Sequence, residues 1–444
     1  MIPVQRNRIV IRSIMIITVF LICLYGAYYI DTSYMPDEWA RKTLSDWICM
    51  NMALPTGKEP ELIMEMYGFS YASRPYLASF IGAVFTKLFS CFSDDPRLLY
   101  LGSRMSSVLS IPVVCFFSLK IGDELFKKPV SSELFAILIC FTPQVLFIGM
   151  FQNCDALSLA CVSAVVLFFI RIIKSNWSIK SCVMMGISVS VCLLSYYNVY
   201  GWLMTAAVLL IISALKTKAV PVRVVIQRIL IMLGIVMCLA APVFIRNAMV
   251  YDGDFLGISA EKMAVQAFEN SNEGSPFMPI NKMGFDTIST IQFYYDLWIP
   301  SSCRSLIGWF GTMKISMSDK VYSLYDIGIL FGIVLAVICL MVRKKDQINR
   351  YALALMTISS LITVALSAYA SYIRDLQYQG RYICSILLLI SYLIVYGQES
   401  MSILIHGDNS DSRLRVCALQ YTTAVAVIGM FVYVGWKYMS QMLG

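Results

Sequence analysis

The chain has 444 residues, of which 59% are hydrophobic and only 14% are charged. Apolar runs of about 20 residues recur along it, which excludes an ordinary soluble protein and predicts an all-α polytopic membrane protein with one domain over residues 1–444. The net charge of +8 does not indicate a nucleic-acid partner, because the basic residues lie in short clusters between the apolar runs. The expected partner is the lipid bilayer.

The first apolar run covers residues 9–30, directly after Arg6 and Arg8. It is too long for the core of a signal peptide, so we expect a retained membrane anchor with a cytoplasmic N-terminus. The loop that follows it then lies outside.

Ten further apolar runs make about eleven predicted spans. They cover residues 98–120, 131–150, 154–173, 180–196, 200–215, 225–245, 321–342, 350–370, 380–398 and 416–438.

Residues 72–92 are less clear, because this apolar segment holds Arg74 and Pro75 near its start and Lys87 near its end. Counting it as a span would move most of the basic clusters to the outside, against the positive-inside rule. We therefore predict a helix on the outer surface here. Residues 31–97 and 246–320 become two large extracytoplasmic loops, and the C-terminus is extracytoplasmic.

Asp37 and Glu38 follow Pro36 just after the first span. Carboxylates near hydrocarbon are costly, so this pair needs either a solvated surface or a chemical task. The sequence contains one histidine, His406, so acid–base chemistry would fall to carboxylates. The alternative is that both acids occupy the first turn of a short helix and stabilise its dipole.

Asn153 and Asp155 lie at the outer end of the fourth predicted span. One of them can cap the helix that starts near Ala156, or both can contribute to a site. Trp309, in the second outer loop, is either an interface anchor or a platform for a sugar ring.

Arg246 and Arg381 lie at the outer ends of the seventh and tenth predicted spans. Each can extend to the interface, or the two can converge beneath the outer loops and bind a phosphate bidentately. Arg104 lies about 9 Å inside the second span, counted at 1.5 Å per residue, and should have a partner there.

Asp252-Gly253-Asp254 matches the DxD pattern of nucleotide-sugar sites, but Asp-Gly is also common in turns, and we favour a turn. The sequence has no glycine-rich phosphate loop, so no nucleotide-binding domain is expected.

Several motifs, taken in order, resemble the integral-membrane glycosyltransferases of the GT-C superfamily, and most closely a bacterial branch catalogued as domain-of-unknown-function family number 2142. The motifs are Pro36-Asp37-Glu38, Leu54-Pro55-Thr56-Gly57, Asn153 with Asp155, Arg246-Asn247, Tyr251-Asp252-Gly253-Asp254, Gly308-Trp309-Phe310-Gly311 and Gln379-Gly380-Arg381-Tyr382. In many relatives a histidine follows the acidic pair, whereas this chain has Arg41 at the corresponding place.

The resemblance implies a GT-C-like fold and transfer of a sugar from a polyprenyl-phosphate donor to a glycan or lipid acceptor of the cell envelope. The reaction would occur at the outer face of a bacterial cytoplasmic membrane. Asp37 would be the general base and Glu38 would orient the acceptor or a divalent metal, which is the one cofactor under consideration. The remaining candidates divide into phosphate-binding residues, Arg246, Arg381 and Arg104, and substrate-binding residues, Asn153, Asp155, Asn247, Trp309 and Gln379.

Two other functions stay open at this stage. A transporter or flippase of lipid-linked sugars would place ionisable residues near the middle of the membrane. A polysaccharide polymerase would share the large outer loops.

Overall fold

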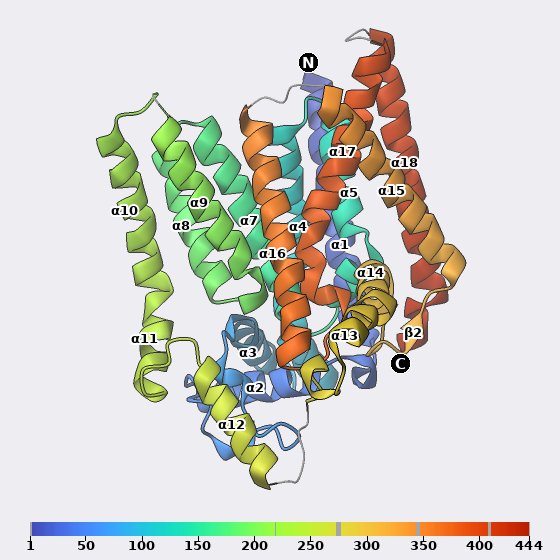
Figure 1. Ribbon diagram of the computed structural model, residues 1–444. Helices are drawn as coiled ribbons and strands as arrows, with labels where there is room; N and C mark the ends of the chain where they lie inside the picture. Colours follow the sequence, from blue (N-terminus) through green and yellow to red (C-terminus); the bar gives the residue numbers. More distant parts are fainter. Residues whose placement is uncertain (1, 218, 272–276, 343–346, 407–409, 444) are drawn as a thin grey trace.

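The computed structural model describes residues 2–217, 219–271, 277–342, 347–406 and 410–443 as a bundle of long helices with shorter helices gathered at its lower end (Figure 1). Nine helices among the described residues are long and apolar enough to cross a membrane. They consist mainly of α1 (Ile2–Tyr29), α4 (Pro96–Leu125), α7 (Asp155–Lys174), α9 (Tyr200–Lys216), α10 (Val222–Leu239), α15 (Asp319–Val342), α16 (Gln347–Ile373), α17 (Leu387–His406) and α18 (Ser410–Lys437).

The other two predicted spans are shorter than expected. Residues 131–150 form α5 (Pro129–Cys140) and α6 (Pro143–Ile148), which are separated where Pro143 removes a backbone donor. Residues 180–196 form α8 (Ile179–Leu193), whose 15 residues extend about 22 Å. Both α5 and α8 run beside the long helices (Figure 1), but neither has the full length of a typical span.

Residues 72–92 contain α3 (Leu77–Ser90), a helix of 14 residues that is too short to cross a bilayer. It lies with α2 (Glu38–Asn51) at the lower end of the bundle (Figure 1). The prediction that this segment is not a full span is therefore confirmed.

The second predicted outer loop also folds at the lower end (Figure 1). It contains α11 (Ala241–Val250), α12 (Ile258–Ser271), α13 (Thr287–Phe293), the π-helical turn η6 (Tyr294–Trp298), α14 (Ile299–Gly308) and a hairpin of β1 (Trp309–Phe310) and β2 (Ile315–Ser316). Short 3-10 turns complete the described structure at η1 (Thr32–Tyr34), η2 (Pro60–Leu62), η3 (Tyr71–Ser73), η4 (Tyr197–Val199), η5 (Ile280–Lys282), η7 (Gly380–Ile386) and η8 (Met439–Met442).

The core lies around α7. In its most apolar stretch 89% of the residues are buried, whereas in the corresponding stretch of α10 only 6% are buried. Apolar side chains on α10, such as Leu230 and Met237, point outward, as expected for contact with lipid.

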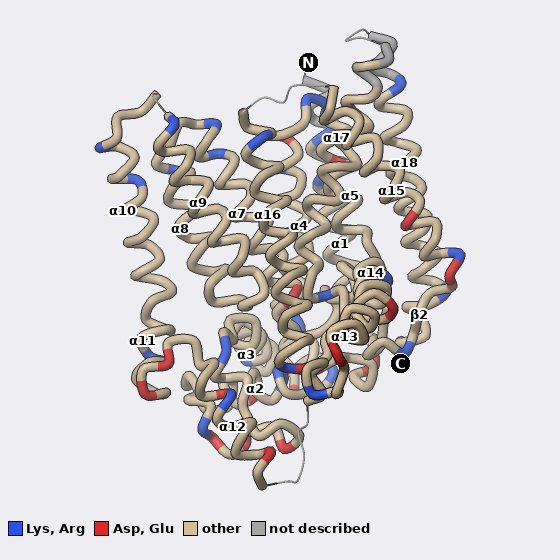
Figure 2. Tube along the Cα trace, viewed as in Figure 1, with Lys and Arg blue, Asp and Glu red and all other residues tan. Residues whose placement is uncertain are grey.

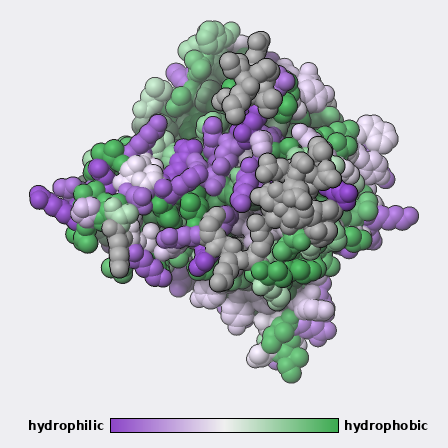
Figure 3. All heavy atoms as spheres, turned by 90° about the horizontal axis from the view of Figure 1, so that it is seen from above, coloured by the Kyte–Doolittle hydropathy of each residue, from purple (hydrophilic) through white to green (hydrophobic). Residues whose placement is uncertain are grey.

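Charged residues concentrate toward the two ends of the bundle (Figure 2). At the upper end Arg12 pairs with Asp123 at 2.7 Å and with Glu133 at 2.6 Å. Seen from that end, hydrophilic side chains gather over the helix ends (Figure 3). The chain also begins at the upper end and finishes at the lower end (Figure 1). These features are those of a multi-pass membrane protein.

Candidate functional site

The two adjacent carboxylates have different environments. Glu38 begins α2 and points into the bundle, where Arg104 donates to its two carboxylate oxygens at 2.8 and 2.6 Å. The backbone N–H of Gln152 donates to the same carboxylate at 2.7 Å, and Arg104 also donates to the carbonyl of Ala27 at 2.7 Å. Glu38 and Arg104 therefore form a buried ion pair, and the acceptor-orienting and phosphate-binding roles that the resemblance implied for them stay predictions.

Asp37 instead remains partly accessible, with a side chain that is 34% exposed. Its backbone is left-handed, with φ of 58° and ψ of 9°, a conformation that a non-glycine residue adopts at an energetic cost. This turn directs Asp37 away from Glu38. One oxygen of Asp37 accepts a hydrogen bond from Arg381 at 2.8 Å.

Asp155, at the first position of α7, lies on the other side of Arg381, with 3.9 Å between its carboxylate oxygen and Arg381 Nε. Arg381 and Asp155 are 3% and 7% exposed, so this contact is shielded from water. The structure thus brings together Asp37, Asp155 and Arg381, three of the predicted site residues, from three separate parts of the chain.

Gly380 fixes the position of Arg381. A Cβ atom on Gly380 would lie 2.0 Å from the backbone nitrogen of Leu306, so only glycine fits against α14 here. The Gly380 N–H donates to Ser305 Oγ at 2.5 Å, and the Arg381 guanidinium donates to Tyr382 Oη at 2.8 Å. The glycine of this motif therefore acts through packing.

Opposing effects act on the Asp37 carboxyl. Burial alone would raise its pKa, but the charges of Arg381 and Arg41 outweigh that effect, and the pKa lies below its ordinary value. Asp37 is consequently ionised at neutral pH, the state that a general base requires.

Arg41 was not among the site residues predicted from the sequence. Its guanidinium donates to Cys154 Sγ at 2.6 Å and lies 4.5 Å from the centre of the Tyr71 ring. Among the described residues, no carboxylate lies within salt-bridge distance of Arg41, and its buried Nε has no hydrogen-bond partner. The signal was present in the sequence, because Arg41 lies four residues after Asp37 at the start of a helix.

Arg74 lies beyond Tyr71, 5.0 Å from the ring centre, but it is neutralised. Glu261, on α12, accepts hydrogen bonds from Arg74 at 2.7 and 2.5 Å and from Arg374. Burial would raise the pKa of Glu261, but the two arginines lower it to about 2. This contact ties the first outer loop, the second outer loop and the end of α16 together.

Arg246 has a different set of partners. It donates to the backbone carbonyls of Leu54 and Pro55 and so holds the Leu54–Gly57 segment against α11. Asn247 beside it is buried. None of the contacts described for Arg246 joins it to Arg381, so the expected convergence of these two arginines gains no support.

Three other candidates have mainly backbone roles. Asn153 lies just before Cys154, the N-cap residue of α7, and its side-chain oxygen accepts a hydrogen bond from the Ala156 N–H in the first turn at 2.9 Å. The carbonyl of Gln379 accepts from the Tyr382 N–H at 3.2 Å. The backbone N–H of Trp309 donates to a side-chain oxygen of Gln144 at 3.1 Å, and the Trp309 side chain is partly exposed.

The Asp252-Gly253-Asp254 segment is a turn, as the sequence indicated. Asp252 and Gly253 have φ of 51° and 93°. Asp254 accepts hydrogen bonds from the N–H groups of Ser259 and Ala260 at 2.7 and 3.0 Å, at the start of α12.

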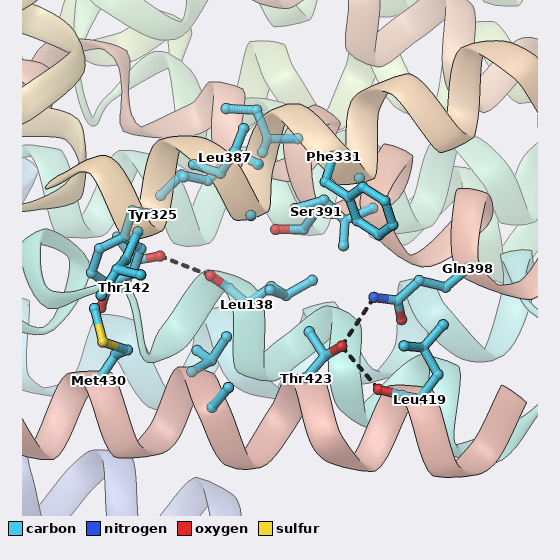
Figure 4. Close-up of a pocket in the computed structure, with 18 residues that line it drawn as sticks. Leu138, Thr142, Tyr325, Phe331, Leu387, Ser391, Gln398, Leu419, Thr423 and Met430 are labelled. Carbon is cyan, nitrogen blue, oxygen red and sulfur yellow. Dashed lines mark hydrogen bonds between the residues drawn. The ribbon is translucent and has the colours of Figure 1, made fainter. Parts of the chain in front are cut away.

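A cavity of about 260 Å³ lies between α5, α15, α17 and α18 (Figure 4). Apolar side chains dominate its wall, and Gln398 donates to Thr423 at 3.0 Å within it. No charged side chain is among the described residues that line this cavity, so no carboxylate there can transfer a proton. The candidate catalytic groups are those around Asp37.

Solved structures share this arrangement of helices, although no family model matches the sequence and no curated relative is found. ArnT from Cupriavidus metallidurans bound to undecaprenyl phosphate has a TM-score of 0.58 at 14% identity, covering 96% of this chain and 75% of ArnT. The Archaeoglobus fulgidus oligosaccharyltransferase tethered with an acceptor peptide has a TM-score of 0.54 at 12% identity, covering 94% of this chain.

The chain spans about half the length of the archaeal enzyme, because the match covers 54% of it. A complex of the Archaeoglobus enzyme AglB with an inhibitory peptide and a dolichol-phosphate has a TM-score of 0.52 at 11% identity. These identities show the fold alone, and the narrower resemblance to family number 2142 is not confirmed. This chain has the fold of ArnT and of the archaeal oligosaccharyltransferase.

Proposed function

We propose that the protein is a membrane glycosyltransferase that moves a sugar from a polyprenyl-phosphate donor to a glycan or lipid acceptor of the bacterial cell envelope. The observation that carries this proposal is an ionised, partly accessible Asp37 next to a guanidinium, Arg41, that has no carboxylate partner among the described residues. A base and an unneutralised cation side by side suit a reaction that deprotonates an alcohol and releases a phosphate.

In the proposed reaction the acceptor hydroxyl oxygen attacks the anomeric carbon of the donor sugar. A C–O bond forms there while the bond between that carbon and the phosphate oxygen breaks. Asp37 takes the hydroxyl proton, and the electron pair of the broken bond leaves on polyprenyl phosphate. Arg41 stabilises the charge that develops on the departing phosphate, and Arg381 keeps Asp37 ionised and oriented.

Arg41 takes the phosphate-binding role in this proposal because its charge acts on Asp37, because Arg104 and Arg381 are each paired with a carboxylate, and because the contacts of Arg246 place it at the Leu54–Gly57 segment. Arg104 is bonded to Glu38, Arg381 to Asp37, and Arg246 to the backbone of the first outer loop. Asn247 of α11, Trp309 of β1 and Gln379, just before η7, remain proposed substrate contacts.

We place the site at the extracytoplasmic face of a bacterial cytoplasmic membrane, with the N-terminus in the cytoplasm. Two observations support this placement. Basic segments gather at the upper end of the bundle, opposite to α2 (Figure 2), as the positive-inside rule expects for the cytoplasmic end. The fold neighbours were also solved with lipid phosphates, undecaprenyl phosphate in ArnT and a dolichol-phosphate in AglB.

A transporter or flippase is less well supported. The charged cluster of Asp37, Asp155 and Arg381 lies where helices end, and the described cavity within the helices has no charged lining residue. Transporters usually place ionisable groups near the middle of the bilayer.

Donor cleavage by the purified protein tests the proposal. The protein is incubated with a panel of polyprenyl-phosphate sugars that differ in the sugar, and release of polyprenyl phosphate is followed by mass spectrometry, with Asp37→Asn as the control. We expect cleavage of one sugar class that depends on Asp37. Movement of intact donors across a liposome membrane, without cleavage of any of them, would contradict the proposal and support a flippase.

A further inference from the structure

The guanidinium of Arg381 occupies the space between two carboxylates. It lies 2.8 Å from Asp37 Oδ2 and 3.9 Å from Asp155 Oδ2. Its place is fixed by the backbone, because Gly380 packs directly against α14 and donates a hydrogen bond to Ser305. Two carboxylates from distant parts of the chain that face one cation are also the usual start of a divalent metal site.

The residues around this point do not fit a divalent metal. Magnesium and manganese take about six oxygen ligands around one centre, usually one or two carboxylates together with waters and phosphate oxygens, and the carboxylates have to be free to face the ion. The described residues contain no group of three or more His, Cys, Asp or Glu side chains that could hold a metal ion. The guanidinium of Arg381 already lies against both carboxylates, 2.8 Å from Asp37 and 3.9 Å from Asp155, in the space that a bound ion would need.

The positive charge of Arg41 also disfavours a divalent metal at this place. Its charge acts on both Asp37 and Asp155, and no carboxylate among the described residues pairs with it. A divalent ion would have to displace one guanidinium and then lie near another. Repulsion between these like charges is strong where water is excluded.

We propose that Arg381 is a built-in cation that takes the place of a divalent metal between Asp37 and Asp155. Arginine is permanently charged and its planar group can contact two carboxylates at once, so it holds Asp37 ionised and in position without an exchangeable ion. Arg381 is thus a positioning residue, and the site works without divalent metals. The part of this statement that concerns turnover rests on the proposed function, whereas the metal-binding part does not.

Manganese binding, measured by electron paramagnetic resonance, tests the proposal without any knowledge of the substrate. The full-length protein is purified in detergent, washed with a chelator and titrated with Mn²⁺. We expect the wild-type protein to show no saturable Mn²⁺ binding that is sensitive to Asp37→Asn or Asp155→Asn. Saturable binding in the wild type that either substitution abolishes would overturn the proposal.

Arg381→Ala leaves the two carboxylates facing each other, and we expect it to gain Mn²⁺ binding that a second substitution, Asp155→Asn, removes. The matched control is Arg304→Ala, which frees Asp319 from an exposed pair at 2.9 Å and should gain no binding. A folded Arg381→Ala protein that binds no more Mn²⁺ than this control would show that Arg381 does not occupy a metal position.

The activity measurement is kept separate. Once a donor is identified, its cleavage by the wild-type protein should be unchanged when a chelator is added, and loss of cleavage that Mn²⁺ or Mg²⁺ restores would contradict the proposal. If no donor in the panel is cleaved, the proposed function fails, but the Mn²⁺ titrations still decide whether Arg381 replaces a metal.

Discussion

Glu38 and Arg104, 66 positions apart in the sequence, form a bidentate ion pair in which neither side chain is more than 2% exposed. The pair joins the start of α2 to the middle of α4. Because Asp37 is the next residue, this pair also holds the backbone from which the candidate base extends.

Glu38→Gln should therefore act on stability first. Removing one partner of a buried ion pair leaves the other charge uncompensated, at a cost of about 3–5 kcal/mol. We expect a clearly lower melting temperature in detergent and lower yield of folded protein. A Glu38→Gln protein with the wild-type melting temperature and no turnover would instead assign a chemical role to Glu38.

Asp37→Asn should lower turnover first and leave stability nearly unchanged. The substitution keeps the shape of the side chain and an oxygen for Arg381 but removes the ability to take a proton. We expect turnover of the donor to fall about 100-fold or more, the range of general-base catalysis, with little change in melting temperature. Measuring both quantities in the same preparation makes the comparison with Glu38→Gln direct. Full turnover in folded Asp37→Asn would leave the proposed reaction without its base.

The pH dependence of turnover should report the Arg381–Asp37 contact. The pKa of Asp37 is depressed, so the active, ionised form is present at neutral pH and is lost only as pH falls below the ordinary range of a carboxyl group. Removing the positive charge in Arg381→Gln should raise the pKa of Asp37 and move the acidic limb of the kcat/KM profile to higher pH. An acidic limb at the same pH in both proteins would mean that Asp37 is not the titrating group.

Arg41 should control donor binding. Loss of a hydrogen bond to a charged group costs about 1.5–3 kcal/mol, so Arg41→Ala should reduce kcat/KM for the donor about 10- to 100-fold. Arg41→Lys keeps the charge but not the planar geometry and should have an intermediate effect. The comparison is Arg246→Ala, which should mainly loosen the segment at Leu54 and Pro55. A larger loss of donor binding in Arg246→Ala would return the phosphate role to Arg246.

Gly380→Ala should disturb the site without changing any charged residue. Its new methyl group would meet the backbone of Leu306 at 2.0 Å, so η7 has to shift and carry Arg381 with it. We expect both melting temperature and turnover to fall. Gly234→Ala, in α10, is the matched control because nothing lies within 4 Å of the added atom. Equal effects of the two substitutions would contradict the packing argument.

Hydropathy was enough to predict the helical membrane fold, and the distribution of basic residues predicted the short, non-spanning helix α3. Hydropathy did not predict the break between α5 and α6, because apolar content does not fix where a helix ends once Pro143 interrupts it. It also did not show that α8 ends at Leu193. The sequence also marked Asp37, Asp155 and Arg381, but not their mutual contacts.

The division of roles between Asp37 and Glu38 depends on a single backbone turn. A left-handed aspartate cannot be recognised from residue type, and without it both carboxylates look alike. Arg41 escaped attention because each predicted phosphate ligand was sought within a span or at its end. Its role depends on which arginines the fold neutralises, and those pairs join residues far apart in sequence.

The left-handed backbone of Asp37, with φ of 58°, introduces backbone strain at the residue that is the proposed base. Glycine adopts this conformation freely, so Asp37→Gly should relieve strain of about 1 kcal/mol or more, but it also removes the carboxylate that pairs with the buried Arg381. The strained turn is therefore kept together with a side chain that both stabilises Arg381 and is the proposed base.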